Sequence, residues 1–322
     1  MLARLNSQLE KKMPLITPTS VVIGVLLAAF LENLAFLIPW IFAFMTFAGS
    51  LKANFSSMKK AIAHPLPLFI VLFVLHIMMP LWAWGVGHIT FAGDTFTITG
   101  LILMMAIPTG ISSLIWVSIY KGSIPLTLTI ILIDTLLSPV IVPLTLTLLV
   151  GAQVDMDVFS MMKGLIMMIV IPSLLAMAVN HLTKDKVSTL LSARLAPFSK
   201  IGMAFVVMIN SAVVSPFLKN LDLKLAGLIM TVFFVAFTGY MFAFIIGRYL
   251  MGDDREAIIA ITFNGGMRNI SAGSVLAVSY FPPPVAVPVV IGMLFQQILA
   301  AIFGAIIDRF YRQNMIVKKQ AM

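Results

Sequence analysis

The sequence predicts an all-α polytopic membrane protein of ten transmembrane helices, arranged as two inverted five-helix repeats in which helices 4 and 9 are discontinuous. Three observations support this fold class: long apolar runs, positive charge on one side of the predicted membrane, and helix-breaking residues at corresponding places in the two halves. Of the 322 residues, 61% are hydrophobic and only 10% are charged. A soluble domain of this length carries about 25% charged residues, so the composition indicates a membrane protein.

Ten apolar segments are long enough to cross a hydrocarbon core about 30 Å thick, which requires about 20 residues in a helix. No apolar segment followed by a small-residue cleavage site stands at the start of the chain, and we expect no cleaved signal peptide. The chain contains no cysteine, which excludes disulfides and cysteine-based metal sites. The predicted spans are residues 14–32, 34–51, 66–87, 96–120, 124–150, 157–180, 197–218, 223–250, 255–280 and 285–308.

Positive charge is distributed unevenly between the two sides that these spans define. If odd-numbered spans run outward, 17 of the 21 Lys and Arg residues lie on one side, and Lys219 and Lys224 lie on the other. Cytoplasmic loops are enriched in Lys and Arg, so both termini are expected in the cytoplasm. The net charge of +9 then reflects orientation in a bilayer, and no nucleic-acid partner is expected. The residues on the positive side are Arg4, Lys11, Lys12, Lys52, Lys59, Lys60, Lys121, Lys184, Lys186, Arg194, Lys200, Arg248, Arg255, Arg309, Arg312, Lys318 and Lys319.

Ten spans with both ends on one side divide into two halves of five, which gives the halves opposite orientations. Interrupted helices at corresponding positions of inverted repeats are typical of secondary transporters. Span 4 contains AIPTGISS (106–113) and span 9 contains FNGGMRN (263–269). A glycine costs a helix interior about 1 kcal/mol and a proline about 3 kcal/mol. Because lipid cannot satisfy freed backbone groups, such breaks must be buried in protein or line a cavity. The expected helix breaks are Pro108, Gly110, Gly265 and Gly266.

Four motifs extend this pattern: PTGISS (108–113), YKGSIPLTLT (120–129), DTLLSPVIVP (134–143) and GGMRNISAGSVLA (265–277). Together they resemble the bile acid:sodium symporter family and its bacterial homologues, and the resemblance follows nearly the whole chain in order. It implies a core domain in which spans 4 and 9 cross at their unwound centres, a panel domain beside it, and a substrate site between the two.

The resemblance also implies a division of the chain between these two domains. Spans 1, 2, 6 and 7 would form the panel, and spans 3–5 and 8–10 would form the core. The boundaries expected are 1–51 and 157–218 for the panel, 66–150 and 223–310 for the core, and 311–322 for a cytoplasmic tail.

Sodium-dependent members of that family carry a Ser-Asn pair at the span 4 break and a Glu-x-Gly-x-Gln-Asn motif at the span 9 break. In span 9 this chain has Asn264 in place of the glutamate and Arg268 in place of the glutamine, although it keeps Asn269. Three further positions where the family has polar side chains are Leu75, Leu114 and Ile131.

Sodium, like other hard cations, needs several oxygen ligands, and these replacements remove oxygens and the only carboxylate. We therefore expect the sodium sites to be degenerate. The weak residual sodium candidates are Ser113, Thr127 and Asn264.

Two ionisable residues lie at similar depth inside predicted spans, Asp134 in span 5 and Arg268 in span 9. A lone Asp or Arg at a helix centre costs about 2.5–3.5 kcal/mol on insertion scales, so we expect a direct contact that places a fixed cation where relatives bind a mobile one. Arg268 is then either a structural cation or a ligand of an anionic substrate. Asp134 is either its structural partner or a proton carrier. His76 and the pair Gln296–Gln297 are expected to form interhelical hydrogen bonds.

Polar residues near the breaks complete the expected site. Asn264 and Asn269 either satisfy unwound backbone or touch substrate. Ser112 and Ser113 either cap the second half of span 4 or bind substrate or ion. Asn210 in span 7 is placed to face the cavity from the panel. The candidate substrate-binding residues are Thr109, Ser112, Ser113, Asn264, Arg268, Asn269 and Asn210.

The predicted function is secondary active transport of an organic anion, bile-acid-like or another carboxylate or sulfonate, by alternating access between core and panel. Na⁺ or H⁺ is the expected coupling ion, and no other cofactor is expected. A conventional sodium-coupled symporter is one alternative; a channel or a non-transporting membrane sensor is another. The sequence lacks HExxH and GxSxG motifs, and an enzyme is not expected.

The expected surroundings of the protein follow from the same observations. We expect an integral protein of the bacterial cytoplasmic (inner) membrane. Its partners are then the lipid bilayer and a small organic anion, with no obligate protein partner.

Overall fold

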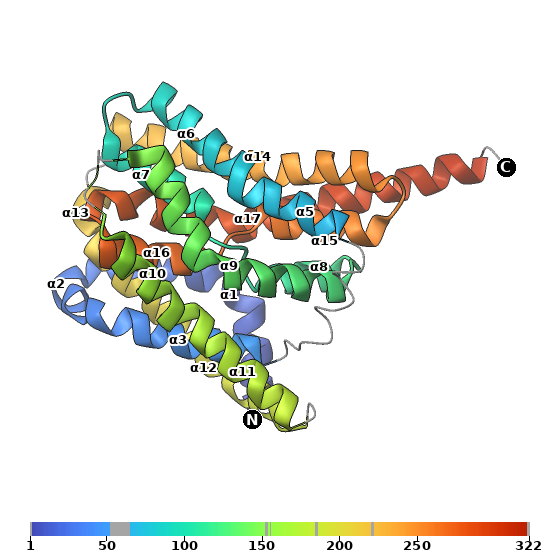
Figure 1. Ribbon diagram of the computed structural model, residues 1–322, viewed down its shortest axis with the longest axis horizontal. Coiled ribbons are helices and arrows are strands. Elements are labelled where there is room, and N and C mark those ends of the chain that lie inside the picture. Colours follow the sequence, from blue (N-terminus) through green and yellow to red (C-terminus); the bar gives the residue numbers. More distant parts are fainter. Residues whose placement is uncertain are drawn as a thin grey trace.

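The computed structural model describes residues 2–51, 65–151, 154, 156–183, 186–219 and 222–320, and all regular elements in these ranges are helical (Figure 1). The expected all-α class is confirmed at this level. Part of the predicted charge asymmetry rests on Lys52, Lys59, Lys60 and Lys184, which lie outside the described residues.

The first half of the chain contains the following elements: α1 (Leu2–Leu26), α2 (Ala28–Leu31), the 3₁₀ turn η1 (Glu32–Leu37), α3 (Ile38–Ser50), α5 (Leu66–Phe73), the π-helical segment η2 (Val74–Met78), α6 (Met79–Thr90), α7 (Thr95–Ala106), α8 (Ser113–Ile119) and α9 (Ile124–Val150).

The second half continues with α10 (Val158–Leu165), the π-helical segment η4 (Ile166–Val170), α11 (Ile171–Leu182), α12 (Lys186–Val213), α13 (Ser215–Leu218), α14 (Leu223–Met251), α15 (Arg255–Gly266), α16 (Ile270–Tyr280) and α17 (Pro283–Gln320). Helix α17 runs on through most of the segment expected as a tail.

Seven helical segments in the described part of the chain are long and apolar enough to cross a membrane. Of the remaining predicted spans, the first corresponds to the apolar end of α1, Leu15–Leu26. The fourth and ninth are divided by breaks into shorter helices. The seven segments are Ala28–Ser50, Leu66–Thr90, Ile124–Val150, Val158–Leu182, Val187–Val213, Leu223–Met251 and Pro283–Tyr311.

Aspartates begin several of these helices. Asp94 accepts a hydrogen bond from Thr97 N at the start of α7, and Asp222 accepts one from Leu225 N at the start of α14. Such side-chain caps satisfy backbone donors that a helix leaves free at its first turn. Asp94 also forms an ion pair with Lys224, with 2.6 Å between Oδ2 and Nζ. The starts of α7 and α14 are therefore held together.

The helices pack as two groups. Helices α1, α3, α11 and α12 contact one another extensively, and α7, α14, α15, α16 and α17 form a second such set. Figure 1 shows α3, α11 and α12 in the lower part of the view and α5, α6 and α14 in the upper part. The groups meet where α12 contacts α16 and α17, and where α1 contacts α17.

Candidate functional site

The breaks in the two interrupted segments lie against each other. Helix α7 ends at Ala106 and α8 begins at Ser113, while α15 ends at Gly266 and α16 begins at Ile270. Between them, the backbone N–H of Asn269 donates to the carbonyl of Pro108 at 2.7 Å. This main-chain hydrogen bond joins two segments far apart in the sequence, and the polar groups of both breaks gather around it.

The four expected breaking residues have different roles in the structure. Pro108 and Gly110 lie in the non-helical stretch between α7 and α8. A Cβ at Gly110 would lie 2.8 Å from the carbonyl oxygen of Arg268, so glycine here permits the close approach of the two chains. The second break, by contrast, comes at Met267–Asn269 rather than at the glycine pair.

Gly265 and Gly266 are the last residues of helix α15, and their expected role as helix breakers is therefore wrong. A Cβ at Gly265 would lie 2.7 Å from the Cβ of Ala243, and one at Gly266 would run into the ring of Tyr240. Both Ala243 and Tyr240 belong to α14. The glycines are needed because α15 packs closely on α14, and the chain leaves the helix only after that contact ends.

Arg268 lies at the point where α7 and α15 end, and only 2% of its surface is exposed. Its Nε donates to the carbonyl of Met105 at 3.1 Å, and its Nη1 donates to Gly265 at 2.7 Å and to Met267 at 3.4 Å. Met105 and Gly265 stand in the last turns of α7 and α15. A helix C-terminus carries a partial charge of about −0.5, so the guanidinium neutralises two converging helix ends.

One nitrogen of Arg268 is left over. Its Nη2 is buried and has no hydrogen-bond partner in the part of the chain that the structure describes. A buried donor without an acceptor costs about 1–3 kcal/mol. An anionic oxygen placed beside Nη2 would remove that cost.

Asp134 on α9 is fully buried and binds the backbone of the first break at Thr109. Its Oδ2 accepts a hydrogen bond from the backbone N–H of Thr109 at 2.5 Å, and its Oδ1 lies 2.5 Å from Nε2 of His76. The expected direct contact between Asp134 and Arg268 is not formed, and no ion pair joins them among the described residues. The carboxylate is already paired with His76, while the guanidinium is held by backbone carbonyls.

Asn264 stands at the centre of a hydrogen-bonded set of fully buried side chains. Its Oδ1 accepts from Ser113 Oγ at 2.9 Å, and its Nδ2 donates to Thr127 Oγ1 at 3.1 Å and to the carbonyl of Ala260 at 2.8 Å. Thr109 adds a hydroxyl that donates to the carbonyl of Asn264 at 2.9 Å. Of the three residual sodium candidates, Ser113 and Thr127 are therefore each hydrogen-bonded to Asn264.

The other candidates lie at the edge of this set. Asn269 caps α16, because its side chain accepts from Ala272 N at 3.3 Å. Ser112 stands at the start of α8 but forms no side-chain cap, and Gln296 Nε2 reaches its hydroxyl at 3.5 Å. The expected capping role of Ser112 is wrong, because its oxygen faces α17 rather than the first turn of α8. Asn210 on α12 donates to Ser274 Oγ on α16 at 2.6 Å, and its Oδ1 has no partner among the described residues.

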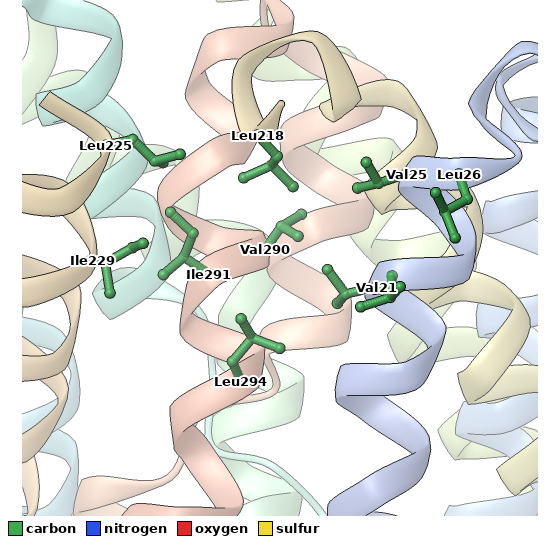
Figure 2. Close-up of a pocket in the computed structure, with 10 residues that line it drawn as sticks. Val21, Val25, Leu26, Leu218, Leu225, Ile229, Val290, Ile291 and Leu294 are labelled. Atoms are coloured by element: carbon green, nitrogen blue, oxygen red, sulfur yellow. The ribbon is translucent and has the colours of Figure 1, made fainter. Parts of the chain in front are cut away.

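An apolar groove of about 300 Å³ lies between α1, α13, α14 and α17 (Figure 2). Figure 2 shows side chains from all four helices pointing toward it. Its lining is aliphatic throughout and is formed by Val21, Val22, Val25, Leu26, Leu218, Leu225, Ile229, Val290, Ile291 and Leu294.

The model of the sodium bile acid symporter family matches residues 39–221, more than half of the chain. The chain belongs to this family. The matched region contains the first break, Asp134 and Asn210. It is a family of membrane transporters, so the apolar helices are those of an integral membrane protein.

Three individual proteins are also similar to this chain. The chain is 58% identical over 306 residues to the Bacillus subtilis protein YbaS, named as uncharacterized, which covers 95% of this chain and 100% of that one. It is 27% identical over 293 residues to YocS of the same species, named an uncharacterized sodium-dependent transporter, with 88% of each chain covered. It is 22% identical over 268 residues to the probable sodium/metabolite cotransporter BASS5 of Arabidopsis thaliana, covering 80% of this chain and 64% of that protein.

The sequence predicts that His76 forms an interhelical hydrogen bond, but it does not identify Asp134 as the partner of His76. The signal is Pro80, which has no N–H for the carbonyl of His76. The helix widens here into a π segment, in which Met79 N donates to Val74 O five residues earlier. Single π turns in helices are frequent at functional sites. Ser274 was also missed, because a serine in an apolar helix gives no signal by itself.

Proposed function

We propose that this chain is a secondary active transporter of an organic anion that does not depend on sodium. The observation that carries the proposal is the buried meeting of the two unwound segments, with Arg268 between them and its Nη2 without a partner. Unwound backbone at membrane depth occurs where it is buried in protein or lines a cavity. Transporters bind substrates at such places.

The charge at the crossover supports an anionic substrate. The guanidinium of Arg268 is positively charged, and its Nη2 can donate a charge-assisted hydrogen bond to an oxygen of a carboxylate or sulfonate. Two of its nitrogens are held by backbone carbonyls, which orients the side chain and leaves Nη2 available. Thr109, Ser112, Ser113, Asn264, Asn269 and Asn210 complete the proposed substrate site.

The proposed architecture is ten spans in two inverted repeats, divided into a panel of spans 1, 2, 6 and 7 and a core of spans 3–5 and 8–10. The two packing groups support this division, since α1, α3, α11 and α12 belong to the panel spans. The apolar groove in Figure 2 lies between panel elements α1 and α13 and core helices α14 and α17. An apolar body on the anion would suit such a surface. Movement of core against panel would give alternating access.

The Asn264 network supports sodium independence. The amide oxygen of Asn264 accepts a hydrogen bond from Ser113, and the hydroxyl oxygen of Thr127 accepts one from the amide nitrogen of Asn264. Binding of sodium to these oxygens would require breaking these bonds. A unit charge a few ångströms from a second cation adds several kcal/mol of repulsion at an effective dielectric constant of about 20. Arg268 supplies that charge permanently. YocS is named a sodium-dependent transporter, and this name favours the alternative, a conventional sodium-coupled symporter.

The test begins with a thermal-shift screen of carboxylates and sulfonates of increasing apolar size on the purified protein in potassium buffer. Stabilising anions are then tested for uptake into proteoliposomes. Saturable uptake and accelerated exchange with internal anion support the transporter. Uptake that rises linearly with concentration indicates a channel, and binding without uptake indicates a sensor. Either result contradicts the proposal.

A further inference from the structure

His76 and Asp134 form a buried pair. Transport of an anion past Arg268 does not itself require such a pair. The distance between His76 Nε2 and Asp134 Oδ1 is 2.5 Å, and the two side chains are 6% and 0% exposed. The other carboxylate oxygen of Asp134 accepts from the backbone N–H of Thr109. The pair is therefore attached to the first unwound segment and shares its position at the crossover.

With Asp134 ionised, these contacts assign the protons of the pair. Thr109 N–H is a donor only, so Oδ2 of Asp134 acts as an acceptor. An ionised Asp134 accepts from both sides, and His76 then carries its proton on Nε2 and donates it to Oδ1. Nδ1 of the neutral ring consequently presents a lone pair. This atom is buried and has no hydrogen-bond partner among the described residues.

We propose that the His76–Asp134 pair is a proton-binding site whose proton is transported together with the anion. One proton leaves a hydronium ion, whose O–H bond breaks to release water, and forms an N–H bond with the Nδ1 lone pair of His76. The resulting imidazolium stays paired with the carboxylate. This proposal rests on the proposed transport function and identifies its coupling ion.

The charges around the pair explain why proton and anion would bind together. Arg268, from the break between α15 and α16, is a charged group close enough to interact electrostatically with Asp134. With His76 neutral, the positive Arg268 and the negative Asp134 balance. A proton on His76 adds one positive charge, and a monovalent anion at Nη2 of Arg268 restores the balance. Each ligand therefore favours the other, as reciprocal linkage requires.

The described elements packed around the pair carry other ionisable groups, most of them near helix ends. Tyr240 lies in mid-helix on α14, but its hydroxyl donates to the carbonyl of Gln296. The α5 and α7 helices carry none, and α8 carries none. The rest stand nearer the ends of their helices: His88 on α6, Lys163 on α10, Lys224, Arg248 and Tyr249 on α14, and Arg255 and Glu256 on α15.

The first experiment observes the proton directly, without any substrate. The chain has four histidines, so nitrogen NMR of the histidine-labelled protein in lipid can follow each ring as pH is changed. His76→Gln assigns the signal, since glutamine can keep the hydrogen bond to Asp134 without the titratable ring. If His76→Gln does not fold, single substitutions of the other three histidines assign the signal by elimination.

The expected result is conversion of the His76 ring from neutral to imidazolium as the pH is lowered. Asp134→Asn should then give less imidazolium at each pH. The proposal is overturned if the His76 signal stays constant as the pH is lowered, or if it is the same in Asp134→Asn as in wild type. This result is independent of whether any anion is transported.

The second experiment measures taurocholate uptake into sodium-free proteoliposomes under an imposed inward proton gradient. His76→Gln should reduce the stimulation by the gradient at least about tenfold, within the usual range of coupling between sites. Exchange of taurocholate at equal pH should persist. The control His88→Gln, an exposed histidine on α6, should behave as wild type. Undiminished stimulation in His76→Gln contradicts the inference, whereas absence of taurocholate exchange in wild type counts against this anion as the substrate and leaves the NMR result to decide.

Discussion

Replacing Arg268 tests whether one guanidinium both stabilises the crossover and binds the anion. Its two shorter hydrogen bonds, 3.1 Å to Met105 O and 2.7 Å to Gly265 O, each contribute about 1.5–3 kcal/mol as bonds from a charged donor. In Arg268→Gln, a neutral amide retains one bond worth about 1 kcal/mol, and removal of the charge also relieves its desolvation. The expected net loss of stability is about 1–3 kcal/mol.

The same change removes Nη2, so anion affinity should fall ten- to a hundredfold, since each tenfold corresponds to about 1.4 kcal/mol. Arg268→Lys keeps the charge but not the planar fork, and its affinity should lie between those of wild type and Arg268→Gln. The assay is isothermal titration of purified protein with the strongest anion of the screen, alongside thermal unfolding.

Arg255→Gln is the matched control, because this arginine begins the same interrupted segment, lies 3.9 Å from Asp308 and has a side chain 35% exposed. It should change stability by less than about 1 kcal/mol, as exposed ion pairs do, and should leave anion affinity unaltered. Unchanged anion affinity in folded Arg268→Gln protein would reduce Arg268 to a structural role. Unchanged stability would refute its role at the two helix ends.

Two further predictions concern stability. Gly110→Ala should destabilise the protein by about 1–3 kcal/mol through overpacking, because its Cβ would lie 2.8 Å from the carbonyl oxygen of Arg268. Gly227→Ala on α14, where a Cβ meets nothing within 4 Å, should stabilise by about 0.5–1 kcal/mol, and equal melting temperatures for the two variants would contradict this packing. Burial raises the pKa of Asp94, but hydrogen bonds with Lys224 and Thr97 outweigh it and hold that pKa below its ordinary value of 3.8. Its contribution to stability is fully present above pH 3.8 and is lost as pH falls through the lower folded pKa. Asp94→Asn keeps the helix cap, so its deficit in thermal unfolding, under about 1 kcal/mol near neutral pH, should vanish in acid, and a deficit that persists there would exclude the ion pair as its cause.

The two breaks illustrate how far the sequence alone leads. Pro108 and Gly110 mark the first break correctly, because proline lacks an N–H and glycine allows the close approach of Arg268. The break in span 9 is predicted at the glycine pair, but it lies directly after that pair, at Met267–Asn269. Glycine also serves close helix packing, and only the position of α14 reveals that Gly265 and Gly266 do so.

The partner of Asp134 could not be predicted from the sequence. The predicted depth of Asp134 and Arg268 in their spans agrees with their burial at the crossover. Which helix face each side chain occupies depends on the crossing geometry and on the π segment before Pro80. The carboxylate consequently pairs with His76, and the guanidinium binds the ends of α7 and α15.

Sodium dependence of uptake tests whether a fixed cation and a closed hydrogen-bonded network stand where related transporters bind sodium. The measurement is initial uptake of a stabilising anion into proteoliposomes at equal internal and external pH, with an inward sodium gradient compared with an inward potassium gradient. Equal rates are expected with the two cations. A sodium gradient that drives accumulation, and fails to do so in Ser113→Ala or Thr127→Val, would contradict it and show that a working sodium site survives at the crossover.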